Sequence, residues 1–280
     1  MKTNLIVAVA LGIGSIIRPG GAASQSPVDC KTYLNSLPKN LELVENAPQK
    51  YLMTAEYFNK DIYGNLWGKV KVTGEYTRGL GDGFVCWNNA YISQTNDPSG
   101  LYQEKEKQEY MENFRYVPSA HIVEESFFKD FPAGTANIFA RNLIWDMFAI
   151  EKYAWKYLDS LELNKTFRAT DLQGGFDMAD IGAYDHTNVE LVWTGISMIN
   201  GNLCAIVEYR ALDNKLEIDL SEFKSKGSEA YWGKTWISLE TRQIEYAEMY
   251  SLTIQEMEGP GIPEKMLTST KRAIAVEKIK

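Results

Sequence analysis

From residue 188 onward, the chain alternates apolar and polar residues in segments joined by short turns. Val189, Leu191 and Trp193 stand at every second position, which is the period of a strand with one buried face. Asn200-Gly201 follows, a dipeptide that favours a two-residue hairpin turn. Returning strands are predicted at residues 203–212, 231–239, 244–257 and 270–279. Because the connections are local and no strand–helix–strand rhythm is present, we expect a curved antiparallel sheet.

A further hairpin is predicted nearer the N-terminus. Residues 69–77 alternate and are rich in β-branched side chains, and residues 84–94 have the pattern of a returning strand after a glycine-rich turn. Three other segments are polar and turn-rich, so we expect them outside the strands. They are a lead-in at 24–50 with one short helix, a solvated helix or loop at 95–118, and a polar excursion at 213–227.

The clearest helix signal covers residues 136–161, where apolar side chains recur at spacings of three or four. One apolar stripe contains Phe139, Leu143, Met147, Ile150, Ala154, Tyr157 and Leu161, and a second contains Trp145, Phe148 and Trp155. A helix with two apolar stripes is either a core helix packed on both sides or a helix that also lines a ligand cavity. The predicted fold is therefore α+β: a curved antiparallel β-sheet, a half-barrel-like meander, with a long helix packed on one face.

The N-terminus has the three parts of a secretory signal peptide. Lys2 precedes an apolar run at residues 4–17, Pro19 ends it, and residues 21–23 are small. The run is too short for a bilayer span, which needs about 20 apolar residues. The alternatives are a membrane anchor or a buried helix. We expect a signal peptide at 1–23, a single α+β domain at 24–280, and export to the periplasm or the extracellular space.

Composition narrows the possible partners. The chain has 29 Lys and Arg against 37 Asp and Glu, a net charge of −8. An acidic surface repels nucleic acid and anionic lipid headgroups, so we expect no nucleic-acid partner. No apolar run after the predicted signal peptide is long enough to span a membrane, so we also expect no transmembrane segment after cleavage.

Chemical motifs are scarce. The chain contains no Gly-x-Ser-x-Gly, His-Glu-x-x-His, Gly-x-Gly-x-x-Gly, phosphate-binding loop or Cys-x-x-Cys. Its three cysteines, Cys30, Cys86 and Cys204, allow one disulfide in an oxidising compartment, but spacing does not identify the pair. We therefore expect no cofactor and consider a non-enzymatic role more consistent with the sequence than an enzymatic one.

One acidic stretch contains several potential metal ligands. Asp177, Asp180, Asp185 and His186 lie close together in a glycine-containing segment. Carboxylates can hold Ca²⁺, and carboxylates with a histidine can hold a transition metal, but the spacing matches no EF-hand loop. The alternative is an exposed loop that uses Asp and Gly for its turns. We expect the loop and no metal.

Trp232 and Trp236 lie four residues apart on one predicted strand, so their side chains share a face. The pair is either core beneath the helix at 136–161 or an exposed platform for sugar rings or acyl chains. We expect this face to meet the helix. The candidate ligand-binding residues are therefore Trp145 and Phe148 on the helix, with Trp232 and Trp236 on the sheet.

Residues 233–244, GKTWISLETRQI, form a strand–turn–strand unit. This unit resembles one found in periplasmic half-barrel proteins similar to the outer-membrane lipoprotein carriers, and the likeness extends over residues 188–279. The turn here is Glu-Thr-Arg-Gln, where the family usually has Asp and Gly. The resemblance implies a curved sheet, closed by helices, that binds acyl chains on its concave face.

Two functional hypotheses follow from these observations. The first is an exported envelope or secreted protein that binds an apolar or amphipathic small molecule such as a lipid, or that is structural. The second is a secreted carbohydrate-active hydrolase that uses a carboxylate pair, which the 37 acidic residues allow without specifying. The first requires a continuous apolar cavity between helix and sheet, and the second requires two acids that face each other across a cleft.

Overall fold

The computed structural model describes residues 42–97, 99–132, 137–220, 223–260 and 265–280. The predicted signal peptide at 1–23, most of the predicted lead-in and Cys30 lie outside these residues. No helix in the described part of the chain is both long and apolar enough to cross a bilayer.

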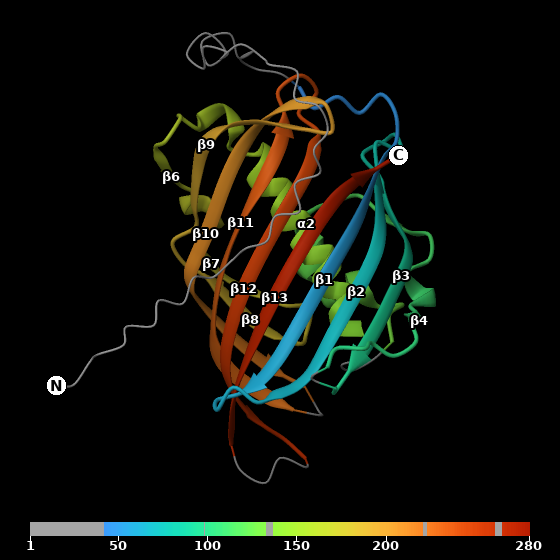
Figure 1. Ribbon diagram of the computed structural model, residues 1–280, viewed down its shortest axis with the longest axis vertical. Coiled ribbons are helices and arrows are strands. Elements are labelled where there is room, and N and C mark those ends of the chain that lie inside the picture. Colours follow the sequence, from blue (N-terminus) through green and yellow to red (C-terminus); the bar gives the residue numbers. More distant parts are fainter. Residues whose placement is uncertain (1–41, 98, 133–136, 221–222, 261–264) are drawn as a thin grey trace, which may run out of the picture. The chain divides into compact units, whose positions relative to one another are not determined.

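The described residues form one antiparallel sheet of 13 strands (Figure 1). Its main strands are β1 (Gln49–Asp61), β2 (Leu66–Arg78), β3 (Val85–Thr95), β9 (Glu190–Ile199), β10 (Asn202–Asp219), β11 (Lys224–Ser238), β12 (Ile244–Glu258) and β13 (Met266–Ile279). The short strands are β4 (Glu106–Lys107), β5 (Phe114–Tyr116), β6 (Thr166–Arg168), β7 (Gly174–Asp177) and β8 (Gly182–His186). The order β4-β3-β2-β1-β13-β12-β11-β10-β8-β7 leaves the sheet open, with β4 and β7 at its two ends.

The C-terminal meander is confirmed. Strands β9 to β13 pair with their sequence neighbours, and β13 then pairs with β1, which joins the two parts of the chain into one sheet. Asn200 and Gly201 turn the chain between β9 and β10 with φ of 53° and 81°. Arg242, with φ of 58°, lies in the turn between β11 and β12. The predicted hairpin at 69–77 and 84–94 is also present as β2 and β3.

One expectation about a polar segment is wrong, and another is wrong in part. The predicted excursion at 213–227 is mostly strand, because β10 and β11 continue through it with Leu216 and Ile218 packed in a small apolar cluster. Charged residues between them alternate to the exposed side, so the segment is polar in composition while keeping the period of a strand. β1 begins at Gln49, where the predicted lead-in ends, and has no counterpart among the predicted strands. Much of residues 95–118 is loop, one of the two predicted alternatives, but the segment also holds β4, β5 and the 3₁₀ turn Glu109–Met111, and Met111 is fully buried.

The predicted helix is present as α2 (Ile138–Trp155), shorter than expected at both ends, and it lies across one face of the sheet (Figure 1). The first apolar stripe is buried, with Leu143, Met147, Ile150 and Ala154 at most 1% exposed. The second stripe is only half-buried at Trp145 and Phe148. One face of α2 is therefore part of the hydrophobic core, whereas other side chains cover the neighbouring stripe only in part.

Close packing and buried polar contacts hold α2 against the sheet. A Cβ atom on Gly74 of β2 would lie 3.1 Å from the Trp87 ring and 3.2 Å from Leu143, so a glycine lets helix and sheet approach closely here. Glu151 of α2 accepts hydrogen bonds from the Tyr76 hydroxyl at 2.8 Å and from Arg78 at 2.5 Å. These contacts hold α2 against β2 at two positions along the helix.

Candidate functional site

The register of the sheet places polar side chains in two adjacent rows on the face toward α2. The first row crosses β11, β12, β13 and β1 at Tyr231, Ser251, Arg272 and Tyr57. The second row crosses β10, β11, β12, β13 and β1 at Asn214, Glu229, Thr253, Thr270 and Asn59. Inward positions farther along the same strands are apolar, as at Ile274, Val276 and Ala247. The inner face therefore changes from an apolar core to a polar band along the length of its strands.

A cavity of about 930 Å³ lies between this polar band and α2. Much of its wall is apolar, including Ile92, Ile122, Phe139, Phe148, Met178 and Leu216. Trp145 also lines it and donates its indole N–H to the carbonyl of Ile122 at 2.8 Å, which orients the ring. Gln103 and Gly174, both exposed, are part of the wall as well, so the cavity reaches solvent.

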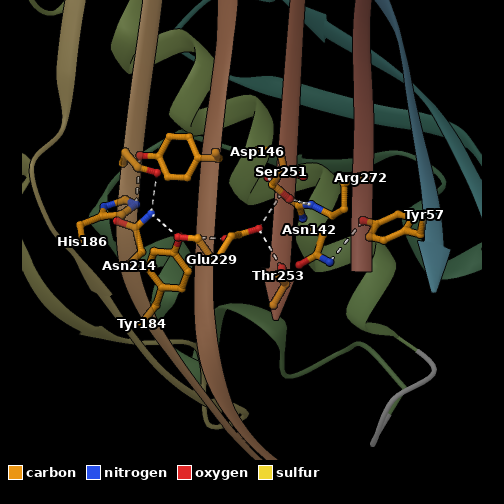
Figure 2. Close-up of polar contacts among 12 residues, drawn as sticks. Tyr57, Asn142, Asp146, Tyr184, His186, Asn214, Glu229, Ser251, Thr253 and Arg272 are labelled. Carbon is orange, nitrogen blue, oxygen red and sulfur yellow. Dashed lines mark hydrogen bonds and ion pairs between the residues drawn. The ribbon is translucent and has the colours of Figure 1, made fainter. Parts of the chain in front are cut away.

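An ionic cluster forms the floor of the cavity (Figure 2). Arg272 donates from Nη2 to Asp146 Oδ1 at 3.0 Å and from Nε to Ser251 Oγ at 3.0 Å, and the same Nη2 lies 3.9 Å from Glu229 Oε1. Tyr184 donates to the other oxygen of Glu229 at 2.8 Å. We call Asp146, Glu229, Arg272 and Tyr184 the floor cluster; it joins α2 to β13, β11 and β8.

Burial governs the protonation of the floor cluster. Loss of solvation raises the pKa of Asp146 to about 6, although Arg272 acts in the opposite direction. The two carboxylates raise the pKa of Arg272 above its ordinary value, against the effect of its own burial. At neutral pH Asp146 is therefore largely ionised, but its pKa lies close enough to neutral that a modest fall in pH protonates it.

A second polar chain runs beside the floor cluster. The hydroxyl groups of Tyr153 and Tyr231 are hydrogen-bonded to each other, and Tyr231 also contacts His186 Nε2 at 3.3 Å. Burial lowers the pKa of His186, so its imidazole is neutral at neutral pH. His186 and Tyr184 both belong to β8, which places this short strand directly on the cavity wall.

Only two of the four predicted ligand-binding residues belong to this cavity. Trp145 and Phe148 line it, whereas Trp232 and Trp236 are absent from its wall. The two tryptophans do share a face, but the prediction that this face meets α2 is wrong: Trp232 is 42% exposed, and the buried positions of this part of β11 are Tyr231, Gly233, Thr235 and Ile237. The pair packs on the outer side against Tyr250 and Tyr246.

The reason for this reversal is the volume available on the inner side of β11. A Cβ atom on Gly233 would lie 2.5 Å from the hydroxyl oxygen of Tyr209, which fills the layer between sheet and helix together with Tyr153. The inner face therefore needs small residues alternating with Tyr231, and the period of two sends both tryptophans outward. The apolar character of the two tryptophans does not by itself show which face of β11 is crowded.

The acidic segment is also more ordered than expected. It forms the hairpin β7–β8 rather than a loop, and Ala179 and Asp180 make its turn with φ of 50° and 69°. Asp177 and Asp180 are exposed, whereas His186 lies on the cavity wall. Within the described ranges, no three His, Cys, Asp or Glu side chains gather as a group that could hold a metal ion.

The two described cysteines are not bonded to each other. Cys86 is half-buried and Cys204 is buried, and both are free thiols. Burial raises the pKa of the Cys204 thiol to about 11, so it is protonated at neutral pH. Neither residue lines the cavity.

The carboxylates of the floor cluster do not have the arrangement that the hydrolase hypothesis requires. Asp146 and Glu229 approach the same nitrogen of Arg272, so they lie side by side on the floor rather than across an open cleft. Both oxygens of Glu229 already accept hydrogen bonds, from Tyr184 and Thr253. A glycosidase pair instead flanks the bond that it cleaves. The floor cluster therefore does not have the geometry of such a pair.

Comparisons with known proteins add little to this description. No protein-family model and no curated protein matches the chain. Among solved structures, lipovitellin, studied for its lipid–protein interactions, shares 11% identity at a TM-score of 0.45 and covers 85% of this chain, which spans 26% of lipovitellin. A DUF1329 family protein from Desulfovibrio piger shares 9% identity at a TM-score of 0.15, with 84% of this chain and 87% of that protein covered. Both likenesses are distant, so function must be inferred from the cavity.

Proposed function

We propose that this protein is exported and binds an apolar or amphipathic small molecule in the cavity between α2 and the sheet. The observation that carries the proposal is a cavity of about 930 Å³ that is largely apolar and has one charged cluster on its floor. Small-molecule pockets have volumes of roughly 300–1,000 Å³ and combine apolar walls with a few placed polar groups. The cavity has both properties.

The side chains of the second apolar stripe of α2 support this reading. If this stripe were ordinary core, other side chains would bury it completely. Instead, Trp145, Phe148 and Ala149 are only half-buried and line the cavity. A bound acyl chain or ring system would remove this apolar surface from water, at about 25 cal/mol per Å². We therefore expect an apolar ligand to bind against the apolar wall of the cavity.

Titration with N-phenyl-1-naphthylamine, an uncharged apolar dye, tests the proposal. We expect saturable binding with a rise in dye fluorescence. Ala149→Phe, which places a ring in the cavity, should weaken dye binding at least tenfold. Trp232→Ala, on the outer face, is the matched control and should leave binding unchanged. Absence of saturable binding, or equal loss in both variants, would contradict the proposal.

Export rests on the N-terminal sequence alone. The intact mass of the protein recovered from its native host tests it, with cleavage expected near Ala23. A mass that retains residues 1–23 would exclude a cleaved signal peptide and leave the binding proposal untouched.

A further inference from the structure

The floor cluster has one buried acceptor that the protein does not use. Asp146 is 8% exposed and lines the cavity, and its Oδ2 has no hydrogen-bond partner among the described residues. Its other oxygen, Oδ1, accepts from Arg272. A buried acceptor without a partner costs free energy, and such groups in native proteins commonly mark a functional role.

The other members of the cluster are already engaged. Glu229 accepts from Tyr184 at 2.8 Å and from Thr253 at 3.4 Å. Arg272 donates to Ser251 and Asp146 and lies over the ring of Tyr57. The cluster therefore offers a bound molecule one acceptor, Asp146 Oδ2.

We propose that the cavity takes an amphipathic molecule whose inner end carries a hydrogen-bond donor, a hydroxyl or a primary ammonium group, and that Asp146 Oδ2 is its acceptor. This inference rests on the proposed function, since it requires the apolar part of the ligand to lie against the apolar wall of the cavity. A carboxylate or phosphate at the same place would lie beside the acidic side chains of Asp146 and Glu229, so anionic amphiphiles are disfavoured. The preferred class is therefore long-chain alcohols and amines rather than fatty acids.

Displacement of N-phenyl-1-naphthylamine at pH 7.5 by four ten-carbon probes tests the head-group preference: decane, 1-decanol, decylamine and decanoate. We expect decanol and decylamine to displace the dye at concentrations at least tenfold lower than decanoate, the difference that one charge-assisted hydrogen bond supports. The order of decanol and decylamine then separates a neutral donor from a cationic one. Decanoate equal to or better than both would overturn the head-group proposal.

The same series separates the two proposals. If no probe displaces the dye and the dye itself does not bind, the proposed function fails. If decane and decanoate displace it as well as decanol and decylamine do, the cavity binds apolar chains and the head-group inference alone fails. The series uses the unaltered protein and so does not depend on whether a variant folds.

Asp146→Asn examines the acceptor itself, because an amide keeps the shape of the side chain and removes its charge. We expect the variant to bind decylamine at least tenfold more weakly, with decane affinity changed less than twofold. Glu248→Gln is the matched control: it removes one negative charge from the outer face of β12, opposite Lys234, and should change neither value. Unchanged decylamine affinity in folded Asp146→Asn would overturn the assignment of Asp146.

Discussion

At the scale of single residues, Asp146 shows how burial changes the protonation of a carboxyl group. It lies on α2, within the layer between helix and sheet, and its carboxylate has one cation that it shares with Glu229. Desolvation disfavours its charged form more than the shared guanidinium favours it, which is why its pKa rises to about 6 from an ordinary value of 3.8. The residue should therefore influence stability near neutral pH.

This setting predicts a pH-dependent stability difference between the unaltered protein and Asp146→Asn. Because the folded-state pKa is raised, the stabilising contribution of protonated Asp146 is complete below about pH 4 and is lost as the pH rises through about 6. The unfolding free energy of the unaltered protein minus that of the variant should fall by about 2 kcal/mol between pH 4 and pH 7. Urea unfolding at the two pH values measures this difference. A constant or rising difference would contradict the prediction.

At the scale of secondary-structure elements, the sheet depends on where its strands carry small residues. Gly233 of β11 lies where a Cβ atom would approach the backbone carbonyl oxygen of Glu248 to 2.2 Å and the Tyr209 hydroxyl to 2.5 Å. A backbone carbonyl in a paired strand cannot move aside without breaking the pairing of β11 with β12. The glycine is therefore a structural requirement of this strand pair.

We expect Gly233→Ala to lower the unfolding free energy by about 3 kcal/mol, at the upper end of the cost of overpacking. Gly195→Ala in β9 is the matched control, since no atom lies within 4 Å of its added Cβ. The control should change stability by no more than about 0.5 kcal/mol, as substitutions away from packed features do. Chemical denaturation of both variants tests the comparison, and equal losses would show that the crowding at Gly233 is relieved by a backbone shift.

At the scale of the whole described domain, helix and sheet are joined by buried charge as well as by apolar contact. Glu151 is 5% exposed and holds Arg78 and Tyr76 of β2, while Arg78 also lies over the ring of Trp155. The Asp146–Arg272 pair makes a second buried link, from α2 to β13. The wall of the cavity is therefore held in place by ion pairs at two positions along α2.

Removal of Glu151 should loosen this arrangement. We expect Glu151→Leu to cost about 3 kcal/mol, because it leaves the Tyr76 hydroxyl and one side of the Arg78 guanidinium buried without their acceptor, while Glu45 keeps its ion pair with Arg78. Glu162→Gln is the control: it breaks an ion pair with Lys165 in which both side chains are about two-thirds exposed, and should cost under about 1 kcal/mol. Thermal or urea unfolding of the two variants measures both costs. Similar small losses of unfolding free energy would mean that apolar contacts alone hold α2 against the sheet.

Much of the fold could be read from local patterns. Alternation at Val189, Leu191 and Trp193, the Asn200-Gly201 turn and the helical spacing on α2 each depend on residues close in sequence, so they predicted the meander and the helix correctly. The errors fell where composition and period disagreed. The stretch at 213–227 is polar yet strand-like, and the acidic hairpin β7–β8 is too short for its alternation to stand out.

The sequence by itself therefore determined the antiparallel sheet and the helix with its two apolar stripes, because these follow from periodicity along the chain. It left open whether the stripe with Trp145 and Phe148 was core or lined a cavity. Tertiary structure decided which face of β11 turned inward and which polar residues met. Arg272 alternates with Ile274 and Val276, a sign that a charge points inward, but its partners Asp146 and Glu229 are far away in sequence. Only strand register and the path of α2 bring them together, since register joins residues that no local pattern relates.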